Sequence, residues 1–228
     1  MRTAIAVLIV VSSLPAAALA AATDTAAAAR VAGADAARGQ TSFLQCTACH
    51  VAAPSDQPRL GPNLWGVVGR AVASVSGYDY TGALRALGGE WSYARLEEYL
   101  RAPMNYAPGT RMVFPGIADA ATRADVVAYL RTRSDDRPSL PAAAPAPGTH
   151  ERSDPFGADW PQGPGREVTG SVCNVCHSLT MVKQQGLPRW RWDELLDWVV
   201  EEQGMAPLDP GNRALVLDYL TQNFGIKP

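Results

Sequence analysis

The sequence predicts an all-α protein made of two small units joined by a linker rich in proline, alanine and glycine. Three observations predict this class. Apolar residues recur at helical spacing in both halves, and no alternating strand pattern of useful length occurs. A stretch with little capacity to form a core, residues 134–163, separates the halves. Each half carries one Cys-x-x-Cys-His pentapeptide, at residues 46–50 and 173–177.

Residues 1–20 have the pattern of a cleaved secretory signal. Arg2 supplies a short positive region, residues 4–11 form an apolar run, and the letters ALA precede AATD. The run is shorter than the roughly 20 residues that a membrane-spanning helix needs, and no later segment is apolar enough to span. We therefore expect a periplasmic mature protein without a membrane span. An uncleaved N-terminal anchor is the alternative.

The two pentapeptides contain all 4 cysteines of the chain. Three interpretations of these cysteines, as disulfides, a zinc site or a redox dithiol, fit poorly. Disulfides closing such small loops would constrain the unfolded chain little. A zinc site would need both pairs, which lie 124 residues apart. A redox dithiol is expected at a thioredoxin-like strand–helix turn, whereas a loop follows residue 50.

Covalent attachment of c-type haem fits both pentapeptides better. Two cysteines separated by two residues can form thioethers with the two vinyl groups of one haem, and the adjacent histidine then becomes the proximal iron ligand. The sequence therefore predicts two covalently bound haem c groups. Their attachment residues are Cys46, Cys49 and His50, and Cys173, Cys176 and His177.

The first unit, residues 34–133, is predicted to be all-α and wrapped around a haem. Helices are expected at residues 34–50, running into the first pentapeptide, and within 91–102 and 119–133. The apolar stripes of the last two helices are Leu96, Tyr99 and Leu100, and Val126, Val127 and Leu130.

This unit resembles class I cytochrome c of the mitochondrial and bacterial c2 type, from GPNLWG at 61–66 to DVVAYL at 125–130. The resemblance implies that Pro62 packs on the proximal histidine and that its carbonyl bonds the imidazole. It implies that the haem propionates are held by Arg70, Tyr80 and Trp91. It also implies that Met112 is the distal ligand, with the hydrogen-bonding neighbours Tyr99 and Thr110.

The position of Met112 agrees with that role. It lies 62 residues after His50, in a Pro/Gly loop that can present a side chain inward, and a thioether opposite an imidazole raises the reduction potential of haem iron. Met104 is the rival ligand. Leu84 departs from the family, where a polar asparagine is usual, so we expect a drier pocket. The unit has 10 arginines, no lysine and 8 acidic residues, so we expect no strong steering of partners by a basic face.

The second unit, residues 164–228, is predicted to have a helix running into the second pentapeptide, a helix over 191–203 and a C-terminal helix. The C-terminal helix has Asp209 as N-cap, Pro210 in its first turn and Gly225 after its end. The middle helix is expected to bury Leu195, Leu196, Val199 and Val200, and to expose Glu194, Asp197, Glu201 and Glu202.

Two methionines compete as distal ligand of the second haem. Met181 follows His177 by only 4 residues, too few to reach the opposite face, whereas Met205 follows by 28 and lies in a loop. Met205 is therefore preferred, with no ligand or a water as the next alternative. Residues 166–225 resemble the small cytochrome units of haem subunits that pair with periplasmic molybdenum sulfite dehydrogenases.

The sequence thus predicts a dihaem cytochrome that carries single electrons, with no catalytic residue. Expected partners are redox proteins: a donor dehydrogenase, including a molybdenum sulfite dehydrogenase, and an acceptor oxidase or reaction centre. Neither nucleic acid nor a membrane is expected as a partner of the mature chain. The alternative hypothesis is a dihaem peroxidase or gas-binding cytochrome, which requires one open haem site.

Overall fold

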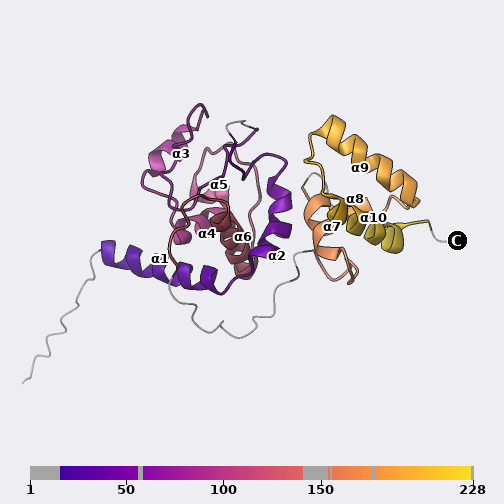
Figure 1. The fold of residues 1–228 in the computed structure, drawn as a ribbon, viewed down its shortest axis with the longest axis horizontal. Coiled ribbons are helices and arrows are strands. Elements are labelled where there is room, and N and C mark those ends of the chain that lie inside the picture. The colour runs from indigo at the N-terminus through magenta and orange to yellow at the C-terminus, as the bar shows by residue number, and fades with distance from the viewer. Residues whose placement is uncertain (1–15, 56–58, 141–153, 155, 176–177, 227–228) are drawn as a thin grey trace, which may run out of the picture.

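The computed structural model describes residues 16–55, 59–140, 154, 156–175 and 178–226 (Figure 1). Within these residues the protein is helical and has no strand, so the all-α prediction is confirmed; an isolated antiparallel bridge joins Ala71 and Glu90. None of the described helices combines the length and hydrophobicity that a bilayer crossing requires.

The helices lie in two groups along the chain (Figure 1). The first group comprises α1 (Ala16–Ala32), α2 (Ala36–Phe43), the 3-10 turn η1 (Leu44–Cys46), α3 (Gly82–Leu87), α4 (Tyr93–Arg101), α5 (Pro103–Tyr106) and α6 (Ala120–Thr132). The second comprises α7 (Arg166–Cys173), α8 (Leu179–Lys183), α9 (Arg189–Gln203) and α10 (Pro210–Phe224).

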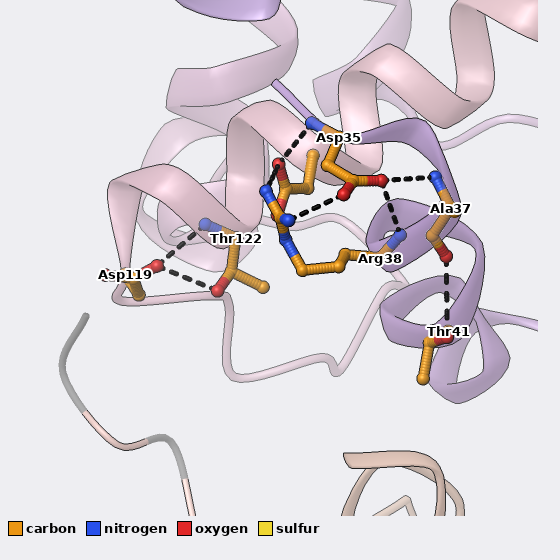
Figure 2. Close-up of polar contacts among 7 residues, drawn as sticks. Asp35, Ala37, Arg38, Thr41, Asp119 and Thr122 are labelled. Atoms are coloured by element: carbon orange, nitrogen blue, oxygen red, sulfur yellow. Dashed lines mark hydrogen bonds and ion pairs between the residues drawn. The ribbon is translucent and has the colours of Figure 1, made fainter. Parts of the chain in front are cut away.

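Helix α2 begins at a side-chain cap and crosses α6 at very short range. The Asp35 carboxylate accepts hydrogen bonds from the backbone N–H groups of Ala37 at 2.9 Å and Arg38 at 3.1 Å (Figure 2). A Cβ added at Gly39 would lie 1.9 Å from the carbonyl oxygen of Asp125 in α6. Only a residue without a side chain allows this approach, which is why glycine occupies the crossing point.

Polar contacts fasten the same two helices from the side. The Arg38 Nε donates to the buried carboxylate of Asp125 at 3.0 Å, and another oxygen of that carboxylate accepts from the Asp35 N–H at 2.8 Å (Figure 2). The rings of Phe43 and Tyr129 meet at a centroid distance of 5.1 Å. The segment that leads into the first pentapeptide is therefore held rigidly against α6.

Helix α1 belongs to the same packed group, which the sequence analysis did not anticipate because it began the first unit at residue 34. Ala27, Ala28 and Val31 are buried against α4 and α6. Arg30 forms an ion pair with Glu97 of α4, whose side chain is buried. Described residues 16–20 already belong to α1, whereas residues 1–15 of the expected signal lie outside the described part.

The predicted helices of the first unit are present close to their expected bounds. Ser92 caps α4 and Asp119 caps α6 with side-chain oxygens, and both apolar stripes are buried as expected. The short helices α3 and α5 were not predicted. Thr81 caps α3, and Pro103 occupies the first position of α5, where its missing N–H costs no hydrogen bond.

The second group is built from α7, α9 and α10. Asp209 caps α10 by accepting from the Asn212 N–H at 3.0 Å, with Pro210 as the first helical residue, as predicted. In α9 the four charged residues expected outside are exposed. The apolar side differs in part, because Leu196 is buried together with Trp192, which was not predicted, while Leu195, Val199 and Val200 are only partly buried.

Both ends of the predicted linker are folded onto the helices beside them. The Pro138 carbonyl accepts hydrogen bonds from Tyr93 at 3.1 Å and Arg131 at 2.8 Å. Trp160 is 1% exposed and its indole N–H donates to the carbonyl of Arg166 at 3.2 Å. The linker expectation of little core-forming capacity therefore fails at these ends, because an isolated tryptophan in a Pro/Gly-rich stretch carries no helical period to reveal its burial.

Candidate functional site

The first Cys-x-x-Cys-His segment forms a tight turn directly after η1. The backbone N–H groups of Cys49 and His50 both donate to the carbonyl of Cys46, at 3.1 and 2.9 Å. The His50 Nδ1 lies 2.8 Å from the carbonyl oxygen of Pro62, which can only accept, so Nδ1 carries the ring proton. Nε2 is left with the lone pair that a metal ligand needs.

The protonation of His50 suits that role. Burial lowers the pKa of the imidazole, and the hydrogen bond to Pro62 acts in the opposite direction. The neutral ring is therefore the stable form at neutral pH, held in one tautomer by a backbone acceptor. The contact between Pro62 and the imidazole that the family resemblance implies is present.

Gly61 also lies very close to the imidazole. A Cβ added there would lie 2.3 Å from the His50 Cε1 and 2.6 Å from Nδ1. The backbone N–H of Gly61 donates to the carbonyl of Cys49 at 2.8 Å, which holds this approach in place. The sequence analysis missed Gly61, and no sequence signal beyond the Gly-Pro pair marked it, because the close approach exists only in three dimensions.

Cys46 and Cys49 of this turn are both free thiols. Burial of the Cys46 sulfur, assisted by the neighbouring Cys49, raises the pKa of the Cys46 thiol to about 12, although the residue as a whole is partly exposed. Cys46 also packs against the first hydrophobic core. This sulfur faces the apolar surroundings that a porphyrin edge requires.

Three residues are expected at the haem propionates, and each of them lies in a polar or buried position. Arg70 donates to the carbonyls of Trp65 at 2.8 Å and Asn63 at 2.9 Å, and burial lowers the pKa of its guanidinium. Tyr80 and Trp91 are both buried. Their contact with propionates stays a prediction.

The loop that carries Met112 is ordered by hydroxyl contacts. Tyr99 and Thr110 share a hydrogen bond at 3.4 Å, and the Thr110 oxygen accepts from the Met112 N–H at 3.2 Å. Met112 packs partly buried against the first core, whereas its rival Met104 is 51% exposed. The geometry favours Met112 as the methionine that points inward.

A cavity of about 410 Å³ opens beside the proximal segment, lined by Ser55, Pro62, Asn63, Val75, Ser76, Gly77 and Tyr78. Pro62 belongs both to this cavity and to the contact with His50, whereas His50, the two thiols and Met112 are not among these lining residues. A histidine in a fixed tautomer, two adjacent thiols and a partly buried methionine are the donor set of a covalently bound haem c. The residues present therefore fit this group.

The second site is described only in part. Cys173 is the last residue of α7, and Cys176 and His177 lie outside the described residues. Met205 is partly buried against the second core, and its N–H donates to the Val199 carbonyl at 3.2 Å. Met181 is 47% exposed. The role of Met205 as distal ligand stays a prediction.

The second group contains a buried hydrogen-bond donor that the sequence analysis did not predict and that has no acceptor in the described part of the chain. The indole Nε1 of Trp192 is buried and finds no hydrogen-bond partner among the described residues, while the residue is 3% exposed. The hydroxyl groups of Thr169 and Thr221 in the same group also have no partner among the described residues. A buried N–H without an acceptor costs free energy, so an acceptor beyond the described residues, such as water or a bound group, is expected to meet it.

Comparison with known proteins shows that the first unit is similar to cytochromes c. A profile of the cytochrome c family matches residues 36–134. A cytochrome c homolog from Rickettsia bellii is 40% identical over 104 residues, covering 46% of this chain and 60% of that protein. Cytochrome c2 from Rhodomicrobium vannielii is 39% identical over 99 residues, covering 43% of this chain and 79% of that protein.

Among solved structures, cytochrome cH from Methylobacterium extorquens is 41% identical, with 43% of this chain and 98% of that chain aligned and a TM-score of 0.41. This chain spans only 60% of the length of the Rickettsia bellii homolog. It spans 79% of cytochrome c2, at 39% identity. The chain therefore belongs to the cytochrome c family, whose members carry covalently bound haem c.

Proposed function

We propose that this chain is a dihaem c-type cytochrome that carries single electrons between redox proteins in the periplasm. The observation that carries the proposal is the 2.8 Å contact between His50 Nδ1 and the Pro62 carbonyl, directly after two thiols at haem-attachment spacing. It prepares Nε2 as an iron ligand in a family that binds haem c.

Haem c supplies an iron that takes up and releases one electron. The chain's own residues hold the site in one geometry throughout. Pro62 and Gly61 keep the imidazole from rotating, and the Tyr99–Thr110 contact orders the loop of Met112. If His50 and Met112 both bind the iron, no coordination position would remain for a substrate, which favours a carrier over an enzyme.

The second haem is proposed on Cys173, Cys176 and His177, with Met205 as distal ligand. Support comes from the pentapeptide itself, from the partly buried Met205, and from the buried indole N–H of Trp192. The signal-like residues 1–20 support the periplasmic location.

The proposed partners are proteins that give or take one electron. The likeness of residues 166–225 to the cytochrome units of sulfite dehydrogenases supports a molybdenum sulfite dehydrogenase as donor. An oxidase or a reaction centre is the proposed acceptor. Purified sulfite dehydrogenase should reduce the holoprotein in stopped-flow experiments. If other dehydrogenases reduce the holoprotein and sulfite dehydrogenase does not, this donor is rejected.

The haem number is tested first. The full chain is produced with periplasmic haem maturation, and haem and iron per polypeptide are measured by pyridine haemochrome assay, mass spectrometry and elemental analysis. We expect two haems, two irons and no zinc. The Cys173→Ser/Cys176→Ser variant should retain one haem. One haem in the wild type, or bound zinc, would reject the dihaem proposal.

Ligation separates the carrier from the open-site alternative. Met112→Ala and Met205→Ala should each remove one sulfur-to-iron charge-transfer band in the near infrared and lower one reduction potential, because a ligand that favours reduced iron is lost. Met181→Ala is the matched control and should change neither. Ready binding of carbon monoxide by the reduced wild type at one haem would instead favour a peroxidase or gas-binding function.

A further inference from the structure

The two helices that lead into the pentapeptides pack against each other. Helix α7 contacts both α2 and η1, and Leu44 of η1 packs against the hydrophobic core of the second unit. These neighbours lie side by side in Figure 1, between the two groups of helices. We call this contact the anchor junction, and define it by Arg38, Thr41, Leu44, Glu167 and Val168.

Three observations place residues of α2 and η1 next to α7. At its beginning, the Glu167 carboxylate acts electrostatically on Arg38, so the first turns of α7 and α2 are neighbours. Thr41 lines a cavity of about 360 Å³ together with residues 165–168. Leu44 lies against the core that contains Val168 and Val172, and η1 as a whole contacts α7.

The contact between η1 and α7 has a direct consequence for the attachment residues. The 3-10 turn η1 ends at Cys46, and α7 ends at Cys173. Because these two elements contact each other, the two pentapeptides begin close together.

The junction is anchored in the first unit by groups that do not depend on the second. Arg38 is held by the buried Asp125 at 3.0 Å, and α2 is pressed on α6 at Gly39. On the other side, the Arg166 carbonyl accepts from the buried Trp160. Each face is therefore presented by a rigid element, so that the contact needs little ordering when it forms.

We propose that the anchor junction is a fixed interface that starts the two haem attachment segments side by side and thereby couples the two redox centres of the chain. This inference rests on the second haem of the proposed function. Coupling means that the electron lost by one centre is gained by the other, while the donor and acceptor proteins supply and remove it. One chain then offers an entry site and an exit site.

The experiment compares the full-length holoprotein with junction variants. Leu44→Glu places a charge in the apolar contact, and Glu167→Lys sets two positive charges against each other at an exposed position. The matched controls make the same exchanges at exposed positions away from the junction, Ile226→Glu and Glu202→Lys. Haem content and thermal unfolding are measured for all, so that misfolded protein is recognised.

Circular dichroism in the Soret region and small-angle X-ray scattering are the readouts. We expect the wild type to show an exciton couplet that exceeds the sum of the two single-haem variants, Cys46→Ser/Cys49→Ser and Cys173→Ser/Cys176→Ser. The junction variants should lose the couplet and gain radius of gyration, and the controls should keep both at wild-type values.

The outcomes separate the inference from the function on which it rests. Two haems per chain with a Soret spectrum equal to that sum would overturn the junction and leave the dihaem proposal intact. One haem per chain would reject the dihaem proposal; scattering would then still report whether Leu44→Glu opens the contact. A wild-type radius unaffected by both junction variants would also overturn the inference.

Discussion

Replacing Gly61 by alanine tests whether the close approach to His50 sets the properties of the first haem site. The added Cβ would lie 2.3 Å from Cε1 and 2.8 Å from Nε2 of the imidazole, where ordinary contact begins near 3.4 Å. The ring must therefore retreat by about 1 Å. The 2.8 Å hydrogen bond between Nδ1 and the Pro62 carbonyl then lengthens past useful range.

The size of the effect follows from that hydrogen bond. A net hydrogen bond contributes about 0.5–1.5 kcal/mol. For a one-electron couple about 1.4 kcal/mol corresponds to ~59 mV, so the change is roughly 20–60 mV at most. The bond makes the imidazole a stronger donor to oxidised iron, so that losing it should raise the potential.

Potentiometric titration of the purified holoprotein measures this shift. Gly82→Ala is the matched control, because a Cβ there meets nothing within 4 Å, and its potential should equal that of the wild type. Haem loading is measured in parallel. A Gly61→Ala protein with full haem content and an unchanged potential would refute the reasoning, since the imidazole would have accommodated the methyl group without moving.

Three further predictions concern folding. Gly39→Ala should destabilise the holoprotein by ~1–3 kcal/mol in denaturant titrations, because its Cβ would lie 1.9 Å from a carbonyl oxygen of α6; an unchanged midpoint would contradict this crossing. Arg30→Ala should cost ~1–3 kcal/mol by leaving the Glu97 carboxylate buried and unpaired, and wild-type stability would show that α1 does not pack in solution. Arg166 holds the pKa of Asp154 below its ordinary value, so this pair stabilises the fold above the unfolded-state pKa and loses its effect as the pH falls through the lowered value. Asp154→Asn should therefore cost ~1 kcal/mol at neutral pH and less in acid, as followed by thermal unfolding across pH; an equal loss at both would refute the pairing.

The helices whose ends carry local signals were predictable from the sequence. Asp209 and Pro210 mark the start of α10, and the stripe around Leu96 marks the buried side of α4, because caps and helical periodicity act within one turn. The prediction for α9 was less complete. Trp192 lies among charged residues, and its burial depends on the helices packed around it.

Helix α1 escaped prediction for a related reason. Its buried residues are mostly alanines, which carry little hydrophobic signal, and they follow an apolar leader-like stretch. What places α1 in the fold is long-range: Arg30 reaches Glu97, and Asp24 accepts from the Ala94 N–H at 2.9 Å. Contacts across such sequence distances leave no periodic trace.

The residues of the candidate site also fall into those that the sequence predicted and those that only the folded structure reveals. Spacing alone predicted the thiols and His50, because attachment of one haem requires neighbours in sequence. The family resemblance, rather than the spacing, pointed to the contact of Pro62 with His50, which is present at 2.8 Å. Neither source indicated Gly61 or Trp192, since a steric approach and a buried donor without an acceptor become visible only once the chain is folded.

In both groups of helices, a glycine lies against a backbone carbonyl of the last helix. In the first group, Gly39 of α2 lies against the Asp125 carbonyl of α6. In the second group, Gly165, directly before α7, lies against the Leu215 carbonyl of α10. An aromatic ring of the last helix packs near each crossing, Tyr129 in one and Tyr219 in the other. These close approaches hold α2 and the start of α7 against the last helix of each group. The repeated device supports the proposal that the second unit, like the first, is built to present a haem attachment segment, even though the family profile matches only residues 36–134.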